Sequence, residues 1–217
     1  MRIFLLLLFF GLIGCSEEAV PNADVSGPMV EGANASGHDM SMHDDGAMVL
    51  EGSAAELGDH SLYQVESTWT NQAGVSMQLA SLKGKPIVVA MTYTSCEVSC
   101  PRIVSAMQHV LSDTKTDAGF VLISIDPERD TVDQLQEYAS KMKLDASRWN
   151  LLTGVEDDVR EMAALLGVRY QQMPDGEFAH SNIITVLDSD GVIYHQQNGI
   201  ASDLTAETLA QLNLLSN

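Results

Sequence analysis

An apolar run over residues 86–91, followed at once by two cysteines one helical turn apart, constrains this 217-residue chain more than any other feature. The run predicts a buried strand, and the cysteines lie in the segment Thr94-Ser95-Cys96-Glu97-Val98-Ser99-Cys100-Pro101. Pro101 is suited to the first position of a helix, where a missing N–H costs nothing. We therefore expect both thiols at a strand-to-helix turn, where they could bind a soft metal or form a disulfide.

The start of the chain has the layout of an export signal. Arg2 is followed by an apolar run over residues 3–13, which is too short to span a bilayer. Leu12-Ile13-Gly14-Cys15 resembles the lipobox of bacterial lipoproteins, which implies that residues 1–14 are removed and that Cys15 carries the lipid. The alternative is an ordinary signal with Cys15 removed or free. We expect an exported lipoprotein, anchored in the inner or the outer membrane and facing the periplasm or the outer side of the cell membrane.

Cysteine use and charge limit the classes of partner. If Cys15 is lipidated, the other two of the three cysteines form a pair, and no odd thiol is left in an oxidising compartment. The chain has 30 acidic and 11 basic residues, a formal net charge of -19. This charge disfavours nucleic acid and anionic membrane surfaces as partners. We expect the protein to be attached to the membrane through its lipid anchor.

Residues 15–60 are expected to form a flexible acidic tether, because their composition offers little apolar surface to bury. The remainder, residues 61–217, has the length of one domain. The tether also contains thioether and imidazole groups, which favour Cu(I). We interpret these groups as a weak copper-capturing site, and the alternative is a linker in which they are incidental. They are His38, Met40, Met42, His43 and Met48.

Hydrophobic periodicity and turn signals predict a mixed α/β domain. A small N-terminal hairpin is expected over residues 62–79. The strands expected after it cover residues 86–92, 120–125, 182–187 and 192–196. The expected helices cover residues 102–111, 131–142, 156–166 and 204–215. A βαβ start, an antiparallel hairpin and a closing helix indicate an α/β sandwich of the thioredoxin kind with an N-terminal β-hairpin extension.

A second polar loop, Asp126-Pro127-Glu128-Arg129-Asp130, follows the second core strand. Loops at the carboxyl ends of neighbouring parallel strands meet at one edge of the sheet. Asp126 is therefore a candidate neighbour of the thiols, one that would support the site without binding the ligand. The alternative is that Asp126 caps the next helix or shapes the turn with Pro127.

The spacing of the cysteines argues against ordinary thioredoxin chemistry, which uses a pair two residues apart and a cis-proline before the late strand. Three residues separate Cys96 from Cys100, and His180 stands where that proline is expected. Two thiolates and one imidazole suit copper as Cu(I) or Cu(II). Zinc could use the same ligands with one position left open for water, but we favour copper.

Three motifs together resemble the Sco/SenC family of copper-binding, thioredoxin-like proteins that assemble cytochrome oxidase. The resemblance covers nearly all of residues 61–217. The motifs are Tyr93-Thr94-Ser95-Cys96 with Cys100-Pro101, Asp126-Pro127-Glu128-Arg129-Asp130-Thr131, and His180-Ser181 with Asp190-Gly191. Glu97 departs from the family, which often has proline there, and so does Ala179, where aspartate is frequent. The second departure leaves the partner of His180 unidentified.

The resemblance implies a metallochaperone, not an enzyme, that delivers copper to the copper centre of a respiratory oxidase subunit. Cys96, Cys100 and His180 would bind the copper, and Cys96 and Cys100 would also form a redox disulfide. The alternative is a thiol-disulfide oxidoreductase that reduces the cysteines of that subunit or of other exported proteins. Other periplasmic copper carriers or thiol reductants are further expected partners. A thiol peroxidase is disfavoured because no Pro and Thr precede Cys96 at the spacing that those enzymes use to activate peroxide.

Overall fold

Residues 61–216 are described in the computed structural model of the protein. The predicted lipidation site Cys15 and the predicted copper-capturing segment, residues 38–48, lie outside the described residues and stay predictions. In the described part, no helix combines the length and the apolar character needed to cross a membrane.

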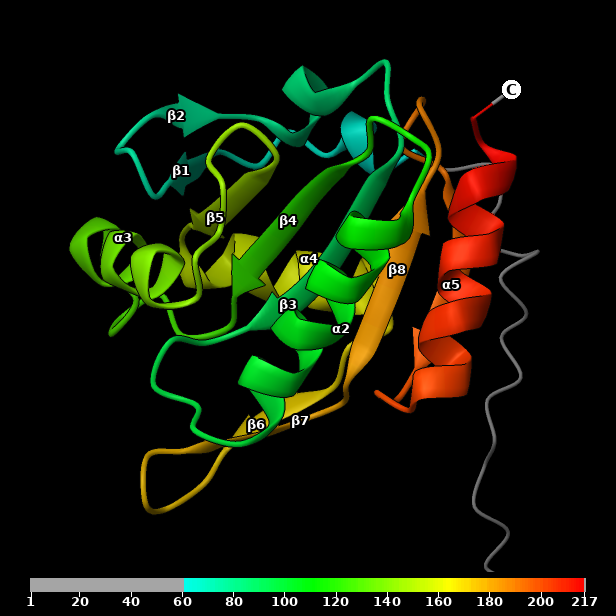
Figure 1. Ribbon diagram of the computed structural model, residues 1–217. Coiled ribbons are helices and arrows are strands. Elements are labelled where there is room, and N and C mark those ends of the chain that lie inside the picture. The colour runs from blue at the N-terminus through cyan, green and yellow to red at the C-terminus, as the bar shows by residue number, and fades with distance from the viewer. Residues whose placement is uncertain (1–60, 217) are drawn as a thin grey trace, which may run out of the picture. The chain divides into compact units, whose positions relative to one another are not determined.

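A mixed seven-stranded sheet forms the centre of the domain (Figure 1). Its strand order is β2-β1-β5-β4-β3-β8-β9, in which β3, β4 and β5 run parallel and the other neighbours pair antiparallel. The strands are β1 (Trp69–Asn71), β2 (Ser76–Met77), β3 (Ile87–Thr92), β4 (Gly119–Ser124), β5 (Trp149–Thr153), β8 (Ile183–Leu187) and β9 (Ile193–Asn198).

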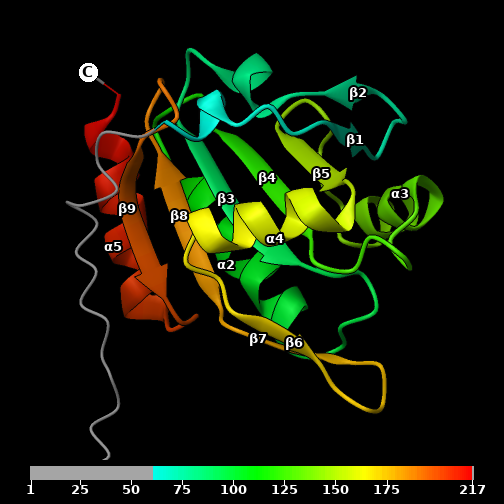
Figure 2. The same cartoon turned by 180° about the vertical axis from the view of Figure 1, so that it is seen from behind.

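Helices cover both faces of this sheet, as Figures 1 and 2 show from opposite sides. Because side chains alternate along a strand, Val88 and Ala90 pack against α2, α3 and α5, whereas Val89 and Met91 lie on the face covered by α4. Every residue of β3 and β4 is buried, which explains their continuous apolar sequence. The helices are α2 (Ser99–Asp113), α3 (Val132–Lys141), α4 (Glu156–Leu165) and α5 (Ser202–Leu214).

This arrangement confirms the predicted thioredoxin-like α/β sandwich and its N-terminal hairpin, which is β1 and β2. One local prediction is wrong. Residues 62–65 were expected to form part of a strand, but Leu62–Gln64 forms the short 3₁₀ helix η1, and a second one, η2 (Leu79–Leu82), follows β2. The Ser61 hydroxyl caps η1 by accepting a hydrogen bond from the Tyr63 N–H, which turns the chain away from an extended path.

Two features of the fold were missed by the sequence prediction. The first is β5, which pairs with β4 on one side and with β1 on the other. The second is a separate two-stranded hairpin, β6 (Tyr170–Gln172) with β7 (Phe178–His180), which precedes β8 and carries His180. This hairpin, called the His180 hairpin below, extends from the lower edge of the domain in Figure 1.

The hairpin between β8 and β9 agrees with the prediction. Its turn ends at Gly191, which has a φ of +82°. A Cβ atom at this position would lie 2.5 Å from the ring of Tyr63, so the close approach of η1 also requires glycine.

Candidate metal centre

The structure brings Cys96, Cys100 and His180 together, although 80 residues separate the second cysteine from the histidine. One possible ligand atom from each residue lies within 4.8 Å of the other two. Both thiols are buried and the imidazole is half-buried. Among the described residues, this is the one group of histidine, cysteine or carboxylate side chains with the spacing of a metal site.

The thiols lie where β3 passes into α2. Helix α2 begins at Ser99, so Cys100 is in its first turn, and Cys96 lies in the turn before it. The Cys96 sulfur accepts a hydrogen bond of 3.3 Å from the N–H of Cys100. Pro101 is the third residue of α2, not the first as expected. This position tolerates proline because the first four N–H groups of a helix have no partner inside the helix.

His180 reaches the thiols from β7. Its Nδ1 lies 3.2 Å from the carbonyl oxygen of Ser181, so an Nδ1–H donates there and leaves Nε2 with a free electron pair. Nε2 is 3.5 Å from the Cys100 sulfur. A backbone carbonyl that fixes the tautomer of a histidine is a common support for a metal ligand. The partner of His180 that the sequence left unidentified is therefore the carbonyl of Ser181.

Hydrogen bonds and burial act differently on the three groups. Burial alone would raise the pKa of Cys96, but hydrogen bonds from Ser99 and from the N–H groups of Cys100 and Val98 lower it to about 7. Burial raises the pKa of Cys100 far above its ordinary value, and the nearby Cys96 thiolate adds to this. Burial lowers the pKa of His180, which keeps the imidazole neutral at pH 7. Cys96 is therefore the more nucleophilic thiol.

Ser99 belongs to this site and was not singled out from the sequence. Its hydroxyl lies 3.2 Å from the Cys96 sulfur and 3.3 Å from Nε2 of His180. The signal was available, because a residue three positions after Cys96 in a helical first turn points back toward it. Ser99 thus links a thiol and the imidazole that come from distant parts of the chain.

Asp126 lies at the same edge of the sheet, and its carboxylate is buried. It is paired with the guanidinium of Arg129. Its carbonyl accepts hydrogen bonds from the N–H groups of Arg129 and Asp130, which shapes the turn. Among the described residues, it makes no hydrogen bond with either thiol or with the imidazole, and the cap of α3 is Thr131.

Asp130 supports the cysteine loop directly. Its fully buried carboxylate accepts hydrogen bonds from the N–H and the hydroxyl of Thr94, the latter 2.5 Å long, and from the hydroxyl of Ser124 at 2.6 Å. Thr94 is two residues before Cys96. The sequence suggested Asp126 as the carboxylate near the thiols. In the structure it is Asp130, four residues later, that supports the cysteine loop.

Arg129 and Tyr93 contact the His180 hairpin and hold it against the rest of the site. Arg129 donates to the carbonyl of Gly176 at 2.7 Å and lies 3.8 Å from the Glu177 carboxylate. The Tyr93 hydroxyl lies 3.0 Å from the Glu177 carboxylate, and its ring meets Phe178 edge-on at 5.4 Å. The position of His180 thus depends on contacts with both loops that follow β3 and β4.

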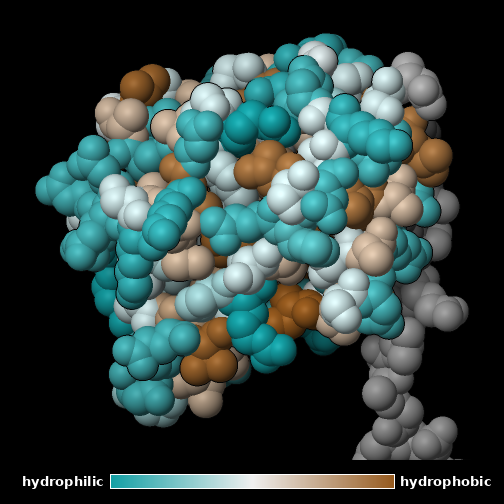
Figure 3. All heavy atoms as spheres, viewed as in Figure 1, coloured by the Kyte–Doolittle hydropathy of each residue, from teal (hydrophilic) through white to brown (hydrophobic). Residues whose placement is uncertain are grey.

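A surface pocket of about 450 Å³ opens beside Cys96. Val98, which is 71% exposed, lines the pocket, and Met173 at the tip of the His180 hairpin is also exposed. Figure 3 shows apolar side chains at the lower edge of the molecule, where the cysteine loop and this hairpin meet. The remaining lining residues are Tyr93, Ser95, Glu97, Ser99, Glu177 and Phe178. Cys96 is itself buried, but it lines this pocket, which gives a partner a route to its thiol.

The donor set fits a soft metal ion. Two sulfur atoms and one imidazole nitrogen are the ligands preferred by copper, and three donors leave one side open. A zinc ion accepts the same ligands. Geometry alone therefore leaves copper, zinc or a disulfide between two free cysteines as the chemistry of the site.

Comparison with known proteins shows which family this chain resembles. The family model described as SCO1/SenC matches residues 56–212. A curated relative, the SCO1 protein homolog of Bacillus subtilis, is 30% identical over 152 residues, which cover 67% of this chain and 79% of that protein.

Solved structures of related proteins have the same fold. The structure of a SCO1/SenC family lipoprotein from Bacillus anthracis is 25% identical, covers 72% of this chain and 96% of that chain, and has a TM-score of 0.66. The structure of Bradyrhizobium japonicum ScoI with copper bound is 26% identical, covers 67% and 96% of the two chains, and has a TM-score of 0.51.

Proposed function

Because this chain belongs to the SCO1/SenC family, we propose that it is a copper-binding chaperone that supplies the copper centre of a respiratory oxidase subunit. The observation that supports this proposal most is the placement of Cys96, Cys100 and His180 within 4.8 Å of one another. A copper-bound relative of the same fold supports copper over zinc.

The chemistry of loading follows from the protonation states of the three ligands. The pKa of Cys96 is about 7, so a substantial fraction of this thiol is ionised at neutral pH and it is the first thiolate that meets the ion. Cys100 must lose its proton when it binds, because burial holds it as a thiol. His180 offers Nε2 as a neutral nitrogen, with its ring held by the Ser181 carbonyl.

Release requires an incoming ligand. The pocket beside Cys96 opens to solvent. A thiolate of the acceptor that enters this pocket can bind a three-coordinate copper ion before the Cys96 thiolate dissociates from it. Release therefore needs no unfolding of the domain.

A second activity, thiol-disulfide exchange, is favoured by one specific observation. Cys96 has a lowered pKa, and the sulfur of Cys100 lies within 4.8 Å of its own, which resembles a nucleophilic thiol with a resolving thiol beside it. Reduction of the acceptor's disulfide would proceed by attack of the Cys96 thiolate, followed by attack of Cys100 on the mixed disulfide. The products are a Cys96–Cys100 disulfide here and two thiols in the acceptor.

Anaerobic titration with Cu(I) tests the proposal. We expect one tight equivalent in the full chain, lost in Cys96→Ser and in Cys100→Ser and weakened at least tenfold in His180→Ala. His195→Ala is the matched control, since His195 is half-buried, lies on β9 and contacts Thr208 of α5. Retention of tight binding in both cysteine variants would contradict the proposal. Rapid disulfide reduction that survives His180→Ala would favour the reductase.

The N-terminal segment enters the proposal in a supporting role. Cys15 would anchor the protein in a membrane with the domain on its outer side. The donors between His38 and Met48 would collect copper and pass it to the tight site. Deletion of residues 38–48 is expected to slow loading from a dilute copper donor and to leave the tight equivalent unchanged. An unchanged loading rate would exclude this role.

A further inference from the structure

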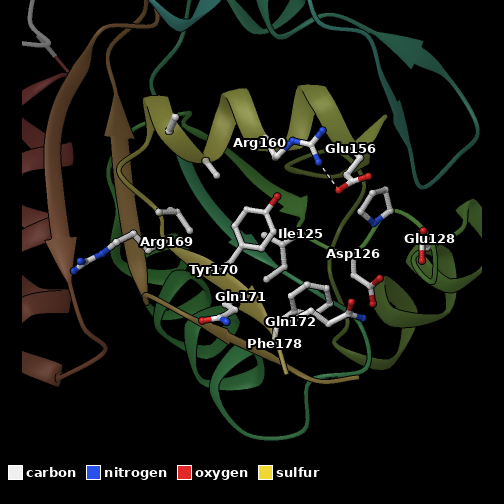
Figure 4. Close-up of a pocket in the computed structure, with 14 residues that line it drawn as sticks. Ile125, Asp126, Glu128, Glu156, Arg160, Arg169, Tyr170, Gln171, Gln172 and Phe178 are labelled. Carbon is white, nitrogen blue, oxygen red and sulfur yellow. Dashed lines mark hydrogen bonds and ion pairs between the residues drawn. The ribbon is translucent and has the colours of Figure 1, made fainter. Parts of the chain in front are cut away.

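A second and larger cavity, of about 750 Å³, lies between α4 and the His180 hairpin (Figure 4). This volume is within the range of ligand-binding pockets. Glu128 and Arg160 belong to its polar lining, and none of the three metal-centre residues lines it. Its apolar lining comes from α4, the hairpin and the segments that follow β4 and α4, and consists of Ile125, Pro127, Ala163, Ala164, Val168, Tyr170 and Phe178.

One wall of this cavity is the outer edge of β6. The hairpin has two strands, so β6 has one neighbour in the sheet. Met173 donates to Glu177 and Ser181 donates to Arg169, and this alternation directs the N–H and C=O groups of Tyr170 and Gln172 away from β7. Within residues 61–216 these main-chain groups make no hydrogen bond to another segment.

The outer edge of β7 is occupied instead. The Tyr93 hydroxyl accepts a hydrogen bond from the Phe178 N–H and lies 3.3 Å from the Phe178 carbonyl. This side chain blocks the pairing of another strand with β7. The hairpin therefore offers a single open edge for a further strand, and that edge faces the large cavity.

We propose that the acceptor protein docks here, by adding an extended segment to the outer edge of β6 and placing its apolar side chains in the cavity. This mode of binding uses main-chain hydrogen bonds for affinity and pockets for specificity. The inference rests on the proposed function, because an acceptor of the copper must approach the pocket beside Cys96. Phe178 lines both the pocket beside Cys96 and the cavity. A segment bound in the cavity would therefore lie next to the acceptor's copper ligands in that pocket.

The charges at the cavity indicate the composition of the segment. Glu128 and Arg169 both line it, appear at opposite ends in Figure 4, and have no ion-pair partner within residues 61–216. A segment with alternating apolar side chains and a basic side chain near Glu128 fits these groups. At the same end Asp126 and Glu156 are paired with Arg129 and Arg160, so Glu128 is the carboxylate left to attract a basic side chain, and it disfavours an anionic group there.

Two variants of the full chain test this docking surface. Gln172→Pro removes the outward N–H without touching the bonds between β6 and β7, and Ala164→Phe fills the cavity from the exposed side of α4. The probe is the purified copper-centre domain of the oxidase subunit from the same organism. We expect its dissociation constant to rise roughly three- to tenfold in Gln172→Pro, and by a similar factor or more in Ala164→Phe.

Matched controls separate docking from metal binding. Gln172→Ala keeps the N–H, and Glu161→Phe adds the same ring on α4 outside the cavity, so both should bind the acceptor domain as the unmodified chain does. Copper transfer to dithiothreitol should be equal in all five proteins. Unchanged affinity for the acceptor in both test variants would overturn the inference. It would also be overturned if the test variants lost copper transfer to dithiothreitol by the same factor as they lost affinity for the acceptor.

Two further outcomes would each overturn the assignment of this edge to the acceptor. If the unmodified chain gives no copper to the acceptor domain although it binds copper tightly, the proposed function fails and the inference with it. If the unmodified chain sediments as a dimer that Gln172→Pro dissociates, the edge is occupied by a second copy of this chain. Comparison of thermal unfolding shows whether Gln172→Pro folds, and Ala164→Phe tests the other wall of the cavity independently.

Discussion

The hydroxyl oxygen of Ser99 lies 3.2 Å from the sulfur of Cys96, close enough to donate a hydrogen bond to a thiolate. Ser99→Ala removes this donor, so we expect the pKa of Cys96 to rise from about 7 toward its usual value near 9. The rate of alkylation of the metal-free protein by iodoacetamide at pH 7 should fall several-fold. Ser95→Ala, in the same loop but exposed, is the control. An unchanged pH profile in Ser99→Ala would show that backbone N–H groups alone stabilise the thiolate.

Copper affinity should depend on pH with a change of slope near pH 7. Above this pH Cys96 is ionised, so binding releases one proton, from Cys100, and the apparent affinity rises about tenfold per pH unit. Below pH 7 Cys96 also has to lose a proton, and the affinity should fall about a hundredfold per unit. His180 adds no further change near neutral pH because burial lowers its pKa. Competition titrations from pH 6 to 8.5 measure both slopes, and a single slope throughout would contradict this assignment.

The central fold could be predicted because its signals are local and strong. The strands β3 and β4 are buried on both faces, so each is a continuous apolar run, and the turn before β9 contains Asp190-Gly191. Strand β5 was missed because Asn150 interrupts its apolar run and its pairing with β4 and β1 comes from distant sequence. The two strands of the His180 hairpin have three residues each, too few for a period to appear. The turn signal Pro174-Asp175-Gly176 was available between them.

The grouping of Cys96, Cys100 and His180 could be predicted from residue types, whereas the carboxylate that supports the cysteine loop could not. Two thiols and a histidine stand out in a sequence because few roles other than metal binding require them together. The choice between Asp126 and Asp130 depends on which carboxylate points at Thr94 and which at Arg129, and both lie in one short loop. Spacing along the chain carries no information about this difference, which arises only when β3 and β4 pair.

Asp130 should be important for stability because its buried carboxylate accepts hydrogen bonds from Thr94 and Ser124. Asp130→Ala leaves these donors buried without an acceptor, so we expect the free energy of unfolding to fall by at least about 2 kcal/mol. Glu137→Ala, on the exposed side of α3, should change it by less than about 0.5 kcal/mol. Urea denaturation measures both values, and equal stability of the two variants would refute the role of Asp130.

The same carboxylate should also affect how stability depends on pH. Burial raises the pKa of Asp130, and the hydrogen bonds from Ser124 and Thr94 oppose this only in part. The folded state thus holds this proton more tightly than the unfolded chain, so the contribution of Asp130 to stability increases as the pH falls through its raised pKa. Asp130→Asn has no proton to gain and should lose this contribution. Urea denaturation at pH 4.5 and 7 compares the two proteins, and an identical pH dependence would contradict the raised pKa.

Arg129 should control the mobility of the His180 hairpin, because its guanidinium joins the carbonyl of Gly176 to the buried carboxylate of Asp126. In Arg129→Gln we expect amide hydrogen exchange over residues 170–180 to accelerate several-fold, and the affinity for Cu(I) to fall as His180 is held less firmly. Arg160→Gln is the matched control, since Arg160 also pairs with two carboxylates, Glu156 and Asp157, but both are exposed.

The contrast between the two arginines follows from their surroundings. Exposed ion pairs such as those of Arg160 contribute about 0–1 kcal/mol, and their loss leaves solvated groups. Loss of Arg129 leaves the Asp126 carboxylate, which is 4% exposed, without its cation. Exchange that accelerates equally in both variants, or throughout the domain, would indicate general destabilisation. Acceleration confined to residues 170–180 in Arg129→Gln, with Cys96 alkylation unchanged, would identify Arg129 as the residue that positions the hairpin.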